Sequence, residues 1–189
     1  CVKSKKKYGE AFLVQYNEQD PIRGHAISQR HGDSYVVQTV PDMPLSREEL
    51  DHSYTLPYQR TWHPDYDALG GVPAIEEVQF SIAHTRGCSI ATHQGRQVTC
   101  RSEKSVLAEA EAMTKNPRFK GYIHDVGGPT ANFRRAACDK QLKVGTCAGR
   151  QCLFPKPCPN MVVDHTDYIK LLREVRALPK VKKVFVRSG

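Results

Sequence analysis

Four of the seven cysteines lie close together in one loop, and their spacing suits metal binding. Cys138, Cys147, Cys152 and Cys158 follow the pattern C-x8-C-x4-C-x5-C, in a loop stiffened by prolines. Four thiolates are the number that a tetrahedral zinc ion or an iron–sulfur cluster requires. The spacing differs from the C-x-x-C pairs of a zinc ribbon, so reduced structural thiols are the alternative to a metal. His165, just after the loop, could also replace one thiolate.

The other cysteines are isolated in the sequence. Cys88 follows Arg86 and Gly87, and Cys100 lies twelve positions further on. A single cysteine beside a strand end is more often an inert thiol than a metal ligand. Since residues 1–7 lack the apolar core of a secretion signal, we expect reduced thiols or metal ligands rather than disulfides.

After residue 73 the sequence alternates between segments typical of strands and of helices, and these elements must position the cysteines. The pattern predicts strands at residues 78–83, 121–126 and 184–186, and helices at 102–113 and 167–177. Ser102 is the expected N-cap of the first helix, and Ile169, Leu172 and Val175 are spaced for one face of the second. Strands that alternate with helices pair in parallel through right-handed crossovers.

The first 73 residues contain many glycines and prolines and little sustained periodicity, which indicates an irregular N-terminal arm. Within it we expect a short strand at residues 34–40 and a short helix that begins at Ser46. The predicted organisation is therefore an arm or linker at residues 1–73. An α/β core at 74–189 follows, with the cysteine-rich loop at 134–160.

Two segments resemble YgiQ-type radical S-adenosylmethionine (SAM) proteins. Arg86, Gly87 and Cys88, followed by residues 89–96, resemble the loop that holds the iron–sulfur cluster, and residues 121–132 resemble a glycine-rich motif of the same family. The similarity extends into the arm at residues 56–58 and 63–64. The resemblance implies a partial parallel (β/α) barrel made of the first three β/α units of a radical SAM core.

The resemblance also implies a cofactor and a reaction. In this family, three cysteines spaced C-x-x-x-C-x-x-C bind three irons of a 4Fe-4S cluster, and SAM chelates the fourth iron. An electron donor reduces the cluster, and SAM is cleaved to a 5'-deoxyadenosyl radical that abstracts hydrogen from a substrate. Backbone carbonyls in the glycine motif would contact the SAM amino group. The matching residues are Gly127, Gly128, Pro129 and Thr130.

The chain departs from the family at the cluster loop. Between Gly87 and Ser89 it has the single residue Cys88, where the family has a longer run with three cysteines. Cys100 is too far along the chain to restore the spacing. We therefore predict impaired cluster binding, and the sequence assigns neither catalytic residues nor a substrate.

Composition sets the outer limits. The chain is 39% hydrophobic and 25% charged, which is typical of a globular protein, and no apolar stretch is long enough for a membrane helix. We expect a cytoplasmic protein with no membrane partner, and both ends look like those of a fragment. The alternative is a metal-stabilised module whose four cysteines are structural and whose basic surface, with a net charge of +8, contacts RNA. The sequence shows no interleaving of aromatic and basic residues of the kind that stacks bases, which leaves nucleic-acid binding without support. Salt-sensitive RNA binding without SAM binding would select this alternative.

Overall fold

The computed structural model describes residues 3–88, 94–128 and 134–187. The chain divides into two compact units that interleave along the sequence. The α/β unit comprises Leu45–Arg86, Thr99–Arg135 and Asp164–Gly189, and the cysteine-loop unit comprises Cys1–Pro44, Gly87–Val98 and Ala136–Val163. These units are groupings by contact, so the predicted domain boundary at residue 73 stays a prediction.

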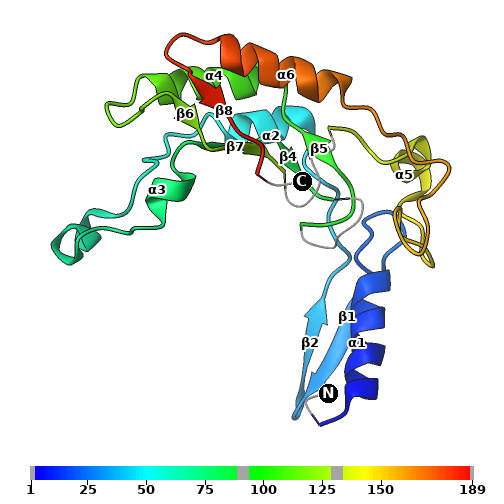
Figure 1. The fold of residues 1–189 in the computed structure, drawn as a ribbon. Helices are drawn as coiled ribbons and strands as arrows, with labels where there is room; N and C mark the ends of the chain where they lie inside the picture. Colours follow the sequence, from blue (N-terminus) through cyan, green and yellow to red (C-terminus); the bar gives the residue numbers. More distant parts are fainter. Residues whose placement is uncertain (1–2, 89–93, 129–133, 188–189) are drawn as a thin grey trace. The chain divides into compact units, whose positions relative to one another are not determined.

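Short parallel strands form the centre of the α/β unit. β3 (Ser81–Ala83) pairs in parallel with β7 (Asp125–Gly127), and β6 (Tyr122–Ile123) pairs in parallel with β8 (Lys183–Val184) (Figure 1). The His124 amide donates to the Phe80 carbonyl at 2.8 Å, and the Val126 amide donates to the Phe185 carbonyl at 3.0 Å. The three segments predicted as strands therefore run side by side and parallel, as the alternation of strands and helices predicts.

Helices connect these strands. α4 (Glu103–Thr114) begins after Ser102, whose hydroxyl accepts a hydrogen bond from the Ser105 amide at 3.1 Å, so the predicted cap is confirmed. α6 (Thr166–Ala177) lies beside α4 in the same unit (Figure 1). The smaller elements of the unit are α2 (Arg47–Ser53), a 3-10 helix η1 (Pro64–Leu69), α3 (Ile75–Val78) and the antiparallel pair β4 (Thr85–Arg86) and β5 (Thr99–Cys100).

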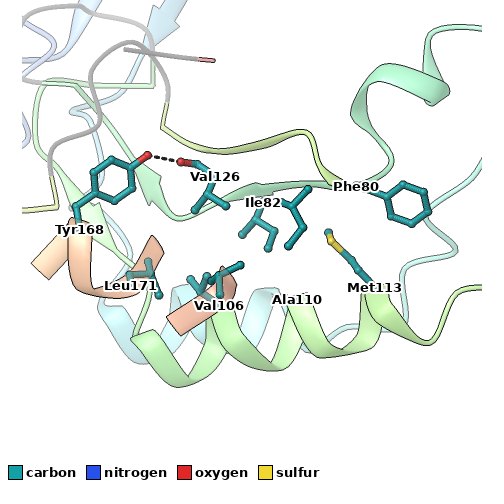
Figure 2. Packing of buried hydrophobic residues seen from close by; sticks show 10 residues of the cluster. Phe80, Ile82, Val106, Ala110, Met113, Val126, Tyr168 and Leu171 are labelled. Carbon is teal, nitrogen blue, oxygen red and sulfur yellow. Dashed lines mark hydrogen bonds between the residues drawn. The ribbon is translucent and has the colours of Figure 1, made fainter. Parts of the chain in front are cut away.

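The hydrophobic core of the α/β unit lies between the parallel strands and the helices α4 and α6. Figure 2 shows the residues of this core. The core comprises Phe80, Ile82, Val106, Ala110, Met113, Ile123, Val126, Tyr168, Leu171 and Val175. The Tyr168 hydroxyl donates to the Val126 carbonyl, so the polar end of this side chain is satisfied inside the core. This packing holds the carboxyl ends of β3 and β7 next to each other.

The buried face of α6 matches the predicted one at Val175, and Leu172 packs against the core as expected, but Ile169 does not belong to it. Tyr168, Leu171 and Val175 are buried, whereas Ile169 is 45% exposed. The pattern of apolar residues fits either face, because Ile169 and Leu171 both lie next to the helical stripe that contains Leu172 and Val175. Packing against the strands selects the face of Tyr168 and Leu171.

This difference can be tested with a matched pair of variants on one helix. Leu171→Ala should lower the free energy of unfolding by about 2–3 kcal/mol, because it removes fully buried methyl groups and leaves a cavity. Ile169→Ala should change it by about 1 kcal/mol or less, because nearly half of that residue is in water already. Urea denaturation of both variants measures the difference, and equal losses would contradict the observed face.

The cysteine-loop unit contains α1 (Lys5–Asn17), the antiparallel hairpin of β1 (Ile27–His31) and β2 (Ser34–Gln38), and α5 (Asp139–Val144). Asp20 connects two of its segments. The Asp20 carboxylate accepts hydrogen bonds from the Thr146 amide at 2.6 Å and from the Thr146 hydroxyl at 2.7 Å. Position 145 must be glycine, because a Cβ on this residue would lie 2.2 Å from Asp20 Oδ1.

Residues 1–73 are more regular than the sequence predicts. The strand expected at 34–40 is β2, and the helix expected at Ser46 is α2, which has a complete capping box between Ser46 and Glu49. α1 and β1 are additional elements, and no residue of α1 is buried. The prediction that a strand begins at Val78 is wrong, because Val78 ends α3.

The architecture is mixed α/β with small sheets. Each sheet within the described residues has two strands, and these strands do not close into a barrel. No helix in the described part of the chain has the length and apolar character that crossing a membrane requires.

Candidate functional site

The loop expected to hold an iron–sulfur cluster begins at Gly87. A Cβ on Gly87 would lie 1.7 Å from the Gln97 carbonyl oxygen, and its φ of +78° also favours glycine. The Cys88 amide donates to the Gly95 carbonyl at 2.9 Å, and the Cys88 side chain is fully buried. Residues 89–93 of this loop lie outside the described part of the chain.

The cysteines near this loop do not fit a cluster held by three thiolates. No cysteine stands between Cys88 and Cys100 in the sequence. Cys100 is 6% exposed at the end of β5, and burial raises the pKa of its thiol to about 11, which disfavours a thiolate. Across residues 3–88, 94–128 and 134–187, no group of three or more histidine, cysteine, aspartate or glutamate side chains is arranged to hold a metal ion.

The predicted SAM-binding glycines follow the carboxyl end of a strand. Gly127 is the last residue of β7, and its carbonyl accepts a hydrogen bond from the His84 amide at 2.9 Å. A carbonyl oxygen can accept a second bond, so this contact leaves Gly127 able to bind a ligand. Gly128 is described next to it, whereas Pro129 and Thr130 lie outside the described residues.

Buried polar groups without partners lie at the same strand ends. His84 directly follows β3 and is fully buried, and neither of its ring nitrogens has a hydrogen-bond partner among the residues that the structure describes. The Thr85 hydroxyl is also buried, and the described part of the chain offers it no partner. Burial, together with the charges of Arg134 and Arg101, lowers the pKa of His84 to about 3, so the ring is neutral. The sequence analysis missed His84, although its position directly after a strand was a usable signal.

A buried arginine joins β3 to α4. Arg101 is 1% exposed and donates to the Ala83 carbonyl at 3.1 Å, to Ser105 and to the Glu109 carboxylate. Arg60 donates to the other oxygen of Glu109 at 2.5 Å. The Arg101 guanidinium also lies 3.7 Å from the centre of the Tyr54 ring. These contacts fix the end of β3 against the first turns of α4.

The four cysteines of the loop at 134–160 come together in the cysteine-loop unit. All four line one cavity of about 30 Å³. Burial raises the pKa of the Cys152 thiol and the other three thiols raise it further, while Arg96 opposes them. His165, the alternative ligand, precedes α6 in the α/β unit.

Arg96 and Gln141 hold the walls of this cavity. Arg96 is 5% exposed and donates to the Cys147 carbonyl at 3.1 Å and to the Arg150 carbonyl at 3.3 Å. Gln141 is buried, and its side-chain amide lies 3.8 Å from Cys152 Sγ as a donor. The sequence analysis missed both residues.

Known proteins match nearly the whole chain. Residues 1–81 match the family model described as Radical SAM N-terminal. A UPF0313 protein of Clostridium perfringens (strain ATCC 13124) is 58% identical over 192 residues, which cover 98% of this chain and 29% of that protein. The chain belongs to the YgiQ-type radical SAM family. A UPF0313 protein of Clostridium botulinum (strain Okra / Type B1) is 56% identical over 193 residues, which cover 98% of the chain and 30% of that protein.

The chain corresponds to only part of each of these relatives. The chain spans about three tenths of the length of these two relatives. The aligned stretches of 192 and 193 positions exceed the 189 residues of this chain, so the relatives have residues without a counterpart here. No solved structure matches the chain.

Proposed function

We propose that this chain forms the N-terminal region and the first three β/α units of a radical SAM enzyme, as part of a parallel (β/α) barrel. The observation that carries the proposal is the parallel pairing of β3 with β7 and of β6 with β8. α4 and α6 are the helices that cross over between these strands. For the whole protein, the proposed activity is reductive cleavage of SAM to a 5'-deoxyadenosyl radical, followed by hydrogen abstraction from a substrate.

We place the SAM site at the carboxyl ends of β3 and β7. Ligands of parallel α/β folds bind at the carboxyl ends of the strands, where backbone groups are accessible. The buried and unpartnered groups of His84 and Thr85 support this placement, because such groups require an explanation such as a ligand. In this proposal Gly127, Gly128, Pro129 and Thr130 present carbonyls to the SAM amino group.

The family's cluster does not fit the residues of this chain, so we propose that the chain as it stands does not assemble a SAM-cleaving 4Fe-4S cluster. Cys88 supplies one thiol where three are needed to leave one iron open to SAM. The greater length of the aligned stretches in the two relatives supports a shortened segment in this chain.

Anaerobic reconstitution with iron and sulfide tests this proposal. The parent chain should give no 5'-deoxyadenosine when it is reduced in the presence of SAM. A variant that extends the loop at Cys88 to C-x-x-x-C-x-x-C should bind about four more irons per chain than a control with the same insertion and serines at the two added cysteines. Comparing the two insertions cancels any iron held elsewhere.

Two outcomes would overturn parts of the proposal. Production of 5'-deoxyadenosine by the parent chain would show that one thiol at Cys88 is sufficient. Equal iron contents in the cysteine and serine insertions would show that the loop after Gly87 is not the place of the cluster. Both measurements leave the cysteines at 138–158 unchanged.

A further inference from the structure

Four thiols from separate positions of one loop surround a single small space. Cys138 precedes α5, and Cys147 follows Gly145 and Thr146 shortly after that helix. The Cys158 amide donates to the Cys152 carbonyl at 2.8 Å, which brings the last two positions together. The cavity that all four line has a volume of about 30 Å³. A cavity of about 10–15 Å³ already holds one water molecule, so this space has room for a single ion.

The charges around this cavity suit an anionic centre. Its lining contains the cationic residues Arg96, Lys140 and Arg150 and no aspartate or glutamate. A divalent ion with four thiolates carries a net charge of about −2, which such cations stabilise. Arg96 is the best placed of the three, because two carbonyl groups of the same loop hold its buried guanidinium.

The polar contacts of the loop also match the surroundings of a thiolate ligand. The Gln141 side-chain amide donates toward Cys152 Sγ at 3.8 Å. Hydrogen bonds to ligating atoms orient them and tune the metal, and their removal commonly lowers metal affinity about 10–100-fold.

We propose that Cys138, Cys147, Cys152 and Cys158 bind one zinc ion as a tetrahedral, structural site. Four thiolates complete the coordination of zinc at Zn–S distances of about 2.3 Å and leave no open position for a substrate. The small cavity favours a single ion over an iron–sulfur cluster, which must accommodate several metal and sulfide atoms. This proposal is independent of the cluster proposed for the whole enzyme.

Zinc binding must tighten the loop. Without metal, no three of the described thiols stand at metal-binding separation. Each of the four thiols gives up its proton to solvent as its sulfur binds, and the ion pulls the four sulfurs together. Binding free energy then appears as folding free energy of residues 136–163.

Titration of the metal-free full chain with zinc, and separately with cobalt, tests the proposal. We expect one equivalent to bind, the cobalt form to show the spectrum of tetrahedral thiolate coordination, and zinc to protect four thiols together from alkylation. Replacing any one of Cys138, Cys147, Cys152 and Cys158 with serine should release most of the metal, whereas Cys1→Ser and Cys100→Ala should retain it. Gln141→Glu, which keeps an acceptor for the Ala137 amide but has no donor for Cys152, should weaken zinc binding about 10-fold or more.

Several outcomes would overturn the site. Four thiols that react independently at rates unchanged by zinc would show that they share no ion, and this measurement needs no variant. Retention of zinc by all four serine variants would place the metal elsewhere. Binding of iron and sulfide in preference to zinc at these cysteines, scored against the serine variants, would replace the zinc assignment with a cluster.

Discussion

Replacing Arg101 with methionine is expected to lower the free energy of unfolding by about 3–5 kcal/mol. Arg101 is 1% exposed and pairs with Glu109, whose side chain is also buried. The variant keeps a side chain of similar length but leaves the Glu109 carboxylate short of one cation in a site where water cannot replace it. It also leaves the Ala83 carbonyl and Ser105 without their donor. Urea denaturation measures the loss.

Arg60→Met provides the matched control, because Arg60 binds the same Glu109 carboxylate. The Arg60 side chain is 29% exposed and remains in reach of water, so its replacement should cost less than that of Arg101, about 1–2 kcal/mol. Equal destabilisation by the two variants would mean that the number of arginines paired with Glu109 matters more than how deeply each arginine is buried. A small effect of Arg101→Met alone would show that water enters this site and solvates Glu109.

The local parts of the fold could be predicted from the sequence. Ser46 and Ser102 were expected as helix caps, and both are, because a cap depends on residues three positions apart. The order of strand and helix after residue 73 likewise predicted three parallel segments. The face of α6 could not be chosen in this way, because Ile169 and Leu171 are equally apolar and only packing against the strands distinguishes them.

The surroundings of the candidate sites depend on contacts between distant residues. Arg96 lies 51 positions before Cys147, whose carbonyl it binds, and Asp20 lies 126 positions before Thr146. No periodicity or spacing rule connects such residues. The number of cysteines in the loop therefore predicted a shared site, but its cationic wall and its Gln141 donor emerge only from the fold.

Asp20 is expected to make the cysteine-loop unit sensitive to acid. Burial alone would raise the pKa of this carboxyl group. Hydrogen bonds from the amide and hydroxyl of Thr146 and from the amides of Ile22 and Arg23 outweigh burial and hold the pKa below its usual range. A group whose pKa is lower in the folded state stabilises the fold above the unfolded pKa, and this stabilisation disappears as pH falls through the folded pKa.

Asp20→Asn should therefore lower the local stability around Thr146 by about 1.5–3 kcal/mol at neutral pH, because asparagine is uncharged and has one acceptor oxygen where the carboxylate uses two. Amide hydrogen exchange at Thr146 measures this loss directly. In the parent chain, protection at Thr146 should fall as pH drops below about 4. The exposed Asp33, in the hairpin of the same unit, gives the control: Asp33→Asn should leave protection at Thr146 and its pH dependence unchanged.

If the Asp20→Asn chain still loses protection with the same pH profile as the parent chain, another carboxylate, such as Glu18, carries the acid response. Because Thr146 directly precedes Cys147, a loop released at Asp20 would also present one of the four thiols less precisely, and zinc affinity should fall in Asp20→Asn but not in Asp33→Asn.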